Sequence, residues 1–419
     1  MELERGSPVR PLRPRGGRGR ALIMNAEKTP RRIVPAIETL IISTGTACNL
    51  DCVYCHNRPF FKSRFPRGAV LSPERFLLVC RDYFAYAKVR GLDRAGFCFS
   101  GGEPLLRGIA YYRELFAVQK RALEEARVPG LRPVNLFQTN GLLLDVKWAR
   151  FLRKNGVRLG LSADGPPSAQ DRARLYGGPG SGAAALERKA ALLNAEGVEF
   201  GFLTVVSEFN SGFPAQTLAW LASMRPQSVA FIPCLDYQGA VGAGAYGDFL
   251  LKVFEEWVKL GRYGLRVRNF HFLLLHFLGA ENPALPCENA GLCPCTVNVN
   301  LDGRVYICDA FMGRRRGLLG GLGRGGLLAL EKSRRYRAAV SAVASLPDRC
   351  RGCQFLPVCN GGCFYRRRGG GKKPDYLCRA NKRLFARVKD YVEKSLSPAR
   401  ALLKTADLMA KGLPPAVGG

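Results

Sequence analysis

Cysteines gathered in three short segments constrain this chain more than any other feature of its sequence. Of 15 cysteines, three fall within Cys48–Cys55, four within Cys287–Cys308 and five within Cys350–Cys378. The first residues lack the apolar stretch of a secretory signal, so a disulfide framework is not expected. Thiols grouped this closely favour metal centres, and the fold must bring their loops together.

Short β-rich runs alternate with helical stretches from about Ile33 to Val267. Six runs are predicted to be strands: Thr39–Thr44, Ala95–Ser100, Val134–Thr139, Val157–Ser162, Glu199–Val206 and Ser228–Pro233. Five segments between them are predicted to be helices: Pro73–Val89, Ile109–Ala126, Asp145–Asn155, Ala183–Glu196 and Pro214–Met224. Strands joined by helices pair in parallel, which indicates an α/β barrel or an open doubly wound sheet. Such folds bind ligands at the carboxyl ends of their strands.

The texture changes in the cysteine-rich region from Cys287 to Cys378, where Gly, Arg and Cys dominate. One β-hairpin is predicted there, formed by Thr296–Asn300 and Val305–Cys308 around an Asp-Gly turn. A region this poor in apolar side chains is expected to need metal to fold. A final amphipathic helix is predicted at about Arg379–Leu396.

The first cysteine group follows the first predicted strand directly. Cys48, Cys52 and Cys55 are spaced to hold three corners of a [4Fe–4S] cube, which leaves one iron without a protein ligand. The alternative is a structural zinc site, which needs four ligands. His56 is available as a fourth, but it directly follows Cys55, a strained spacing for a tetrahedral site.

Three further motifs lie at the ends of predicted strands. Ser100–Pro104 (SGGEP) contains two glycines that allow close backbone approach, although a tight turn with Glu103 capping a helix is the alternative. Gln138–Gly141 (QTNG) ends the third strand and Ser162–Pro166 (SADGP) ends the fourth. Arg174 follows, and its guanidinium suits bidentate binding of a carboxylate; a surface charge is the plainer interpretation.

In this order, the Cys48–Cys55 loop and the strand-end motifs resemble the radical S-adenosylmethionine (SAM) superfamily. The resemblance implies a partial (β/α)6 barrel in which the amino and carboxylate groups of SAM bind the open iron. It also implies cleavage of SAM to a 5′-deoxyadenosyl radical. The residues that it implies for SAM binding are Tyr54, Gly101, Gly102, Glu103, Gln138, Asn140, Ser162 and Arg174.

The later cysteines resemble those of the SPASM domain, a C-terminal module with two auxiliary [4Fe–4S] clusters. The resemblance implies these ligands for auxiliary cluster I: Cys287, Cys293, Cys308 and Cys363. It implies these for auxiliary cluster II: Cys350, Cys353, Cys359 and Cys378. Cys295 is surplus and competes with Cys293 as a ligand. A zinc ribbon is the alternative, because Cys-x2-Cys pairs bind either metal.

Within this group the chain most resembles anaerobic sulfatase-maturating enzymes. The resemblance rests on Gln138–Gly141, Ser162–Arg174, Phe231–Asp236, the Cys287/Cys293/Cys308 spacing and Cys308–Asp309. It implies that Asp309 is a catalytic base in the oxidation of a peptidyl Cys or Ser to formylglycine; an Asx turn at the hairpin end is the alternative. Asn57, where these enzymes typically carry an aromatic residue, and the Gly- and Arg-rich loop at 312–326 leave the substrate open. A peptide maturase that forms thioether or carbon–carbon crosslinks is the alternative function.

We divide the chain into a basic disordered tail (1–32), a radical SAM core barrel (33–267), a SPASM domain (268–396) and a C-terminal extension (397–419). The tail has nine Lys or Arg residues against three acidic ones, and the whole chain has a formal charge of +31. This charge raises the alternative of a metal-bearing nucleic-acid binder. Such a binder has no use for the SAM motifs, so nucleic acid is not expected.

The expected partners are a peptide or protein substrate and an electron donor such as flavodoxin or ferredoxin. The most apolar stretch, Phe270–Ala280, is too short to span a bilayer and contains two histidines. No membrane span is therefore expected. Oxygen-sensitive cluster chemistry implies the cytoplasm.

Overall fold

The computed structural model describes residues 35–395, except 179, 236, 262–264, 281–285, 292, 324 and 368–370. The expected tail at 1–32, the extension at 397–419 and Asp236 therefore lie outside the described residues. All described residues belong to one compact unit. No helix in the described ranges is long and apolar enough to cross a membrane.

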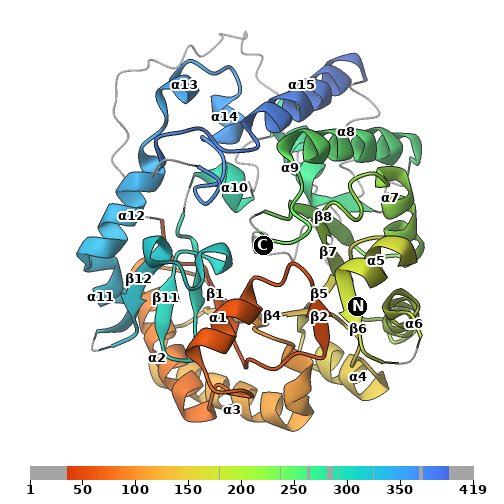
Figure 1. The fold of residues 1–419 in the computed structure, drawn as a ribbon. Coiled ribbons are helices and arrows are strands. Elements are labelled where there is room, and N and C mark those ends of the chain that lie inside the picture. Colours follow the sequence, from red (N-terminus) through yellow and green to blue (C-terminus); the bar gives the residue numbers. More distant parts are fainter. Residues whose placement is uncertain are drawn as a thin grey trace, which may run out of the picture. The chain divides into compact units, whose positions relative to one another are not determined.

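Ten strands form one sheet in the order β12-β11-β10-β1-β3-β4-β5-β7-β8-β9 (Figure 1). Their bounds are β1 (Thr39–Ser43), β3 (Arg94–Ser100), β4 (Arg132–Thr139), β5 (Arg158–Ser162), β7 (Phe200–Val206), β8 (Ser228–Pro233), β9 (Arg266–Val267), β10 (Thr296–Val299), β11 (Arg304–Tyr306) and β12 (Leu318–Gly321). The six strands predicted from sequence are β1, β3, β4, β5, β7 and β8, and every neighbouring pair among them is parallel. The expected α/β fold with six parallel strands is confirmed.

The helices of the first part are α1 (Asn57–Arg64), α2 (Pro73–Arg90), α3 (Gly108–Ala126), α4 (Val146–Lys154), α5 (Pro167–Ala173), α6 (Gly182–Ala195), α7 (Pro214–Ser223), α8 (Ala243–Lys259) and α9 (Arg268–Phe277). Those of the cysteine-rich part are α10 (Cys287–Ala290), α11 (Gly326–Lys332), α12 (Arg334–Ala344), α13 (Asp348–Arg351), α14 (Leu356–Cys359) and α15 (Cys378–Lys394). The five predicted helices correspond to α2, α3, α4, α6 and α7.

Local sequence explains the boundaries of these elements. Strand β1 (TLIIS) is buried along its whole length, as expected for a parallel strand covered on both faces. Helix α2 begins where the Ser72 hydroxyl accepts a hydrogen bond from the Arg75 amide, with Pro73 in its first turn. It ends at Gly91, whose φ of 65° is the left-handed conformation of a helix C-cap.

The predicted hairpin is present as β10 and β11, and it joins the main sheet. Strand β10 pairs in parallel with β1, with Thr296 opposite Thr39. The sheet therefore continues from the predicted barrel into the cysteine-rich part of the chain. Helix α15, the predicted last helix, packs against α8 and α9 (Figure 1).

Buried polar contacts help to hold the cysteine-rich part together. Arg367 is 1% exposed and donates to the carbonyl oxygens of Gly361 (2.9 Å) and Val343 (2.7 Å). Arg366 forms a buried ion pair with Asp375, with 2.9 Å between Nη2 and Oδ2. Hydrogen bonds from an arginine to several main-chain carbonyls fix loops that apolar packing alone would leave loose.

Candidate active site

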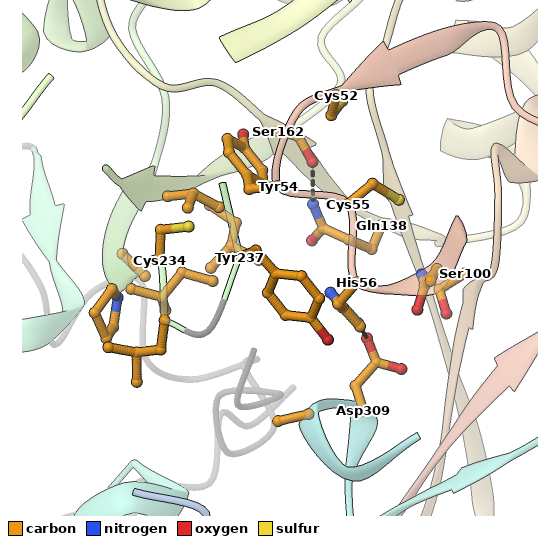
Figure 2. Close-up of a pocket in the computed structure, with 18 of the residues that line it drawn as sticks. Cys52, Tyr54, Cys55, His56, Ser100, Gln138, Ser162, Cys234, Tyr237 and Asp309 are labelled. Carbon is orange, nitrogen blue, oxygen red and sulfur yellow. Dashed lines mark hydrogen bonds and ion pairs between the residues drawn. The ribbon is translucent and has the colours of Figure 1, made fainter. Parts of the chain in front are cut away.

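Loops at the carboxyl ends of the strands face loops of the cysteine-rich part across a cavity of about 350 Å³ (Figure 2). All the residues predicted to bind SAM line it: Tyr54, Gly101, Gly102, Glu103, Gln138, Asn140, Ser162 and Arg174. So do Cys48, Cys52, Cys55, Cys287, Cys363 and Asp309. Residues up to 318 positions apart in sequence thus share one cavity, Cys48 to Arg366 being the widest separation.

The three-cysteine loop is held by a small ribbon that the sequence did not predict. Strand β2 (Leu50–Cys52) pairs antiparallel with β6 (Arg174–Tyr176), and Cys52 stands opposite Arg174. Burial raises the pKa of Cys52 to about 12, although the Arg174 charge lowers it; Cys55 and Cys48 lie near enough to raise it. The three thiols are therefore mutual neighbours at the cavity wall.

These thiols suit a cluster better than a single ion. Among the described residues, no three Cys, His, Asp or Glu side chains are arranged around one metal ion. The ligands of a cube bind different irons and so stand further apart than the ligands of one ion. Because burial raises the pKa of Cys48 and of Cys52, binding of a cluster must release the protons of these two thiols.

The SGGEP segment pairs with the cysteine loop through its backbone. The Gly102 amide donates to the Gly45 carbonyl (2.9 Å), and the Glu103 amide donates to the Ala47 carbonyl (2.8 Å). A Cβ atom on Gly102 would lie 2.1 Å from the Ala47 oxygen. We expected the glycines to admit a ligand; in the structure the second one admits the cysteine loop itself.

Glu103 links two of the strand-end motifs through hydrogen bonds. Its carboxylate accepts from the Leu105 amide (2.9 Å), the Asn140 amide (2.9 Å) and the Thr139 hydroxyl. Burial raises its pKa, while these three hydrogen bonds lower it. The alternative of a cap for the following turn is therefore present, because Leu105 lies in the short 3-10 helix Pro104–Arg107. A role for Glu103 in SAM binding stays a prediction.

The amides of the QTNG segment connect neighbouring strand ends. Gln138 Nε2 donates to the Ser162 hydroxyl at 3.1 Å, which joins β4 to β5 (Figure 2). Asn140 Nδ2 donates to Asn49 in the cysteine loop at 2.8 Å. The segment thus fixes both the loop and the floor of the cavity.

Arg174 is neither a surface charge nor a free cation. It is buried, and its Nε and Nη2 atoms lie 2.9 and 3.3 Å from the two carboxylate oxygens of Asp164. The Tyr54 hydroxyl donates to the same carboxylate, and the Val205 amide donates to it at 3.0 Å. Burial lowers the pKa of Arg174, but Asp164, Tyr54 and Cys52 together more than compensate, so the pKa is raised overall. The carboxylate that Arg174 binds in the structure is thus that of Asp164, where the carboxylate of SAM was expected. The SAM-binding role of Arg174 stays a prediction.

The ligands predicted for auxiliary cluster I lie close to one another. Burial raises the pKa of Cys287, and the neighbouring Cys293 and Cys363 raise it further. Burial likewise raises the pKa of Cys308, with contributions from Cys363 and Cys287. Cys295 instead has Glu38 as its main charged neighbour. The neighbourhood favours Cys293 over Cys295 as the fourth ligand.

The ligands predicted for auxiliary cluster II form a second neighbourhood, away from the cavity lining. Cys350 has Cys378 and Cys353 as neighbours, and Cys359 has Cys378 and Cys350. Burial raises the pKa of Cys359 to about 12. The donor set of each quartet fits a [4Fe–4S] cluster, because each consists of four thiols and nothing else.

Asp309 points into the cavity and has two partners. One carboxylate oxygen lies 3.1 Å from His56 Nε2, and the other accepts from Asn298 Nδ2 at 2.8 Å (Figure 2). Its side chain is 22% exposed, so a substrate can reach it. Asn57, the departure from the family pattern, donates to the Gly101 carbonyl at 2.9 Å and so ties the cysteine loop to the SGGEP segment.

Sequence reasoning missed several residues of the site. Asp164 lies inside the SADGP motif, and only a buried cation near it would have identified it. Tyr237, whose ring lies 6.4 Å from that of His56, and Arg268, at the start of α9, carried no motif. Cys234 is buried, and it also lines the cavity.

Comparison with known proteins agrees with this geometry. The family model described as "Radical SAM superfamily" matches residues 42–215. The serine-type anaerobic sulfatase-maturating enzyme of Bacteroides thetaiotaomicron is 26% identical over 84% of this chain and 90% of its own length. The cysteine-type enzyme of Clostridium novyi is 28% identical over 88% of this chain and 98% of its own.

Solved structures give the same result. Native anSMEcpe with bound AdoMet matches with a TM-score of 0.74 and 25% identity, over 88% of this chain and 99% of that one. Streptococcus suis SuiB bound to its precursor peptide SuiA shares the fold, with a TM-score of 0.57 and 14% identity. From the strand-end motifs, the thiols that share their cavity and these matches, we conclude that residues 42–215 form a domain of the radical SAM superfamily.

Proposed function

We propose that this protein oxidises a Cys or Ser side chain of a peptide or protein substrate to formylglycine, as an anaerobic sulfatase-maturating enzyme. The observation that carries the proposal is Asp309, which faces the predicted SAM-binding residues and the three-cysteine loop across one cavity. The similarity to both serine- and cysteine-type maturases along most of the chain supports it.

We assign the cofactors as SAM, one [4Fe–4S] cluster on Cys48, Cys52 and Cys55, and two auxiliary clusters on the quartets described above. When bound, the first cluster and SAM supply the 5′-deoxyadenosyl radical. The other predicted cavity residues bind and orient SAM beside the substrate. The core barrel (33–267) and the SPASM domain (268–396) remain the proposed division of the chain.

The oxidation of a cysteine removes two electrons and two protons. With SAM and the first cluster bound, the 5′-deoxyadenosyl radical would take a hydrogen atom from the substrate Cβ and become 5′-deoxyadenosine. Asp309 would take the thiol proton, and the auxiliary clusters, when bound to their cysteine quartets, would accept the second electron. The resulting thioaldehyde is hydrolysed by water to formylglycine and hydrogen sulfide. His56 and Asn298 fix the carboxylate in place for this transfer.

An external one-electron donor such as flavodoxin or ferredoxin must reduce the first cluster. Such chemistry requires a reducing compartment, which supports the cytoplasm as the place of action.

Anaerobic reconstitution with SAM, a reductant and a peptide containing Cys-x-Pro-x-Arg tests the function. We expect iron near about twelve atoms per chain, on the principle of three cubes. We also expect 5′-deoxyadenosine and a peptide lighter by the mass change from Cys to formylglycine. A thioether or carbon–carbon crosslink in place of the aldehyde would support the peptide-maturase alternative.

A further inference from the structure

Among the described residues, every charged side chain that lines the cavity except one has a hydrogen-bond or ion-pair partner. Those with a partner are Glu103 with its backbone and hydroxyl donors, Arg174 with Asp164, Asp309 with His56, and Glu288 with Arg366. Arg268 lines the same cavity, and among the described residues no hydrogen bond or ion pair is made by its side chain. Its Nε atom is buried from solvent without a partner.

The position of Arg268 is unfavourable for an unpaired cation. It is the first residue of helix α9, where the helix dipole is positive and repels positive charge. Burial and the nearby positive charge of Arg266 together lower its pKa to about 10. A guanidinium in such a place, without a counter-ion among the residues that the structure describes, fits a site that an anionic ligand completes.

The neighbouring residue holds Arg268 in place. Asn269 exchanges two hydrogen bonds with the Phe231 backbone, accepting from its amide at 2.8 Å and donating to its carbonyl at 2.9 Å. These bonds fix the start of α9 against strand β8. The Arg268 side chain therefore leaves a rigid part of the cavity wall, as a recognition residue requires.

The sheet places Arg268 away from the SAM motifs. Those motifs follow β3, β4 and β5, whereas Arg268 follows β9 at the sheet edge, with β7 and β8 between. Pro286, Cys287 and Glu288 of the cysteine-rich part line the same cavity. Arg268 therefore lines a part of the cavity that β7 and β8 separate from the SAM motifs, which leaves it available to the substrate.

We infer that Arg268 recognises a carboxylate of the peptide substrate, an Asp or Glu side chain close to the residue that is oxidised. This inference rests on the proposed function and adds to it a preference for acidic flanking residues. A guanidinium binds a carboxylate through two parallel hydrogen bonds, which gives both affinity and orientation. Orientation of the target Cβ near the SAM site is what hydrogen abstraction needs.

The test uses fluorescent peptides with a Cys-Ala-Pro-Ala-Arg core. Each peptide carries Asp or Asn either directly before the Cys or directly after it. Anaerobic anisotropy on the reconstituted full chain with SAM measures their affinity. We expect the Asp peptide to bind about tenfold more tightly than its Asn partner at one or more positions, as one charge-assisted pair allows. R268Q should remove this difference, R268K should keep part of it, and R266Q, a neighbouring arginine outside the cavity lining, should leave it intact.

A preference for Asp that survives in R268Q would overturn the inference, and so would equal binding of all peptides by the unaltered protein. If R268Q instead weakens SAM binding and spares the peptide preference, the carboxylate is that of SAM and the inference is wrong. Failure of every peptide to bind also overturns it. Binding with the expected preference but without oxidation would leave the inference standing and contradict the proposed function.

Discussion

Replacing Asp164 by Asn should lower the free energy of unfolding and stop SAM cleavage. The side chains of Asp164 and Arg174 are 1% and 9% exposed, and the carboxylate also accepts from Tyr54 and from the Val205 amide. Removal of one partner of such a pair leaves an uncompensated buried charge, which costs about 3–5 kcal/mol of unfolding free energy. The loss should extend to the cysteine loop, because Arg174 stands opposite Cys52 in the ribbon of β2 and β6.

Anaerobic urea denaturation of the cluster-free protein, followed by circular dichroism, measures the stability. D145N is a matched control, since Asp145 is an exposed helix N-cap and Asn caps a helix equally well. The double variant D164N/R174M should recover part of the stability, because the unpaired charge is gone, but none of the SAM cleavage. A loss below about 1 kcal/mol in D164N, the range of exposed ion pairs, would refute the reasoning.

Other substitutions test single parts of the site. G102A should abolish release of 5′-deoxyadenosine, because the new methyl group would lie 2.1 Å from a main-chain oxygen. The control G244A should release as much 5′-deoxyadenosine as the unaltered protein, because no atom lies within 4 Å of the new methyl group. D309N should release 5′-deoxyadenosine but form no aldehyde by mass spectrometry; formation of the aldehyde at an undiminished rate would exclude the base role. C293A should lose about four irons per chain by iron analysis and C295A should lose none, on the principle of one cube per quartet; the reverse result would exchange the two residues as ligands.

The sequence predicts the strands of the barrel well because each is an apolar run long enough to be recognised locally. Strand β1 (TLIIS) and strand β8 (SVAFIP) are of this kind. Strand β9 has only two residues, and β2 and β6 have three each, so no local pattern marks them. They form because neighbouring strands and loops present free backbone groups, which only the assembled fold provides.

The candidate site follows the same division. Cys48, Cys52 and Cys55 and the strand-end motifs are visible in sequence, because the chemistry requires fixed spacings within one loop. The pairing of Arg174 with Asp164 is not, since a buried charge and a surface charge look alike in sequence. Arg268 carries no motif at all, and only its buried Nε atom, which has no partner among the described residues, distinguishes it.

Release of 5′-deoxyadenosine by the reconstituted protein tests the central claim most directly. With SAM and reductant, we expect 5′-deoxyadenosine to be formed, and we expect the variant with Cys48, Cys52 and Cys55 all replaced by Ala to form none. That variant should retain about eight irons, on the principle of two remaining cubes. Fully reconstituted protein that releases no 5′-deoxyadenosine, or equal release from the triple variant, would contradict the account.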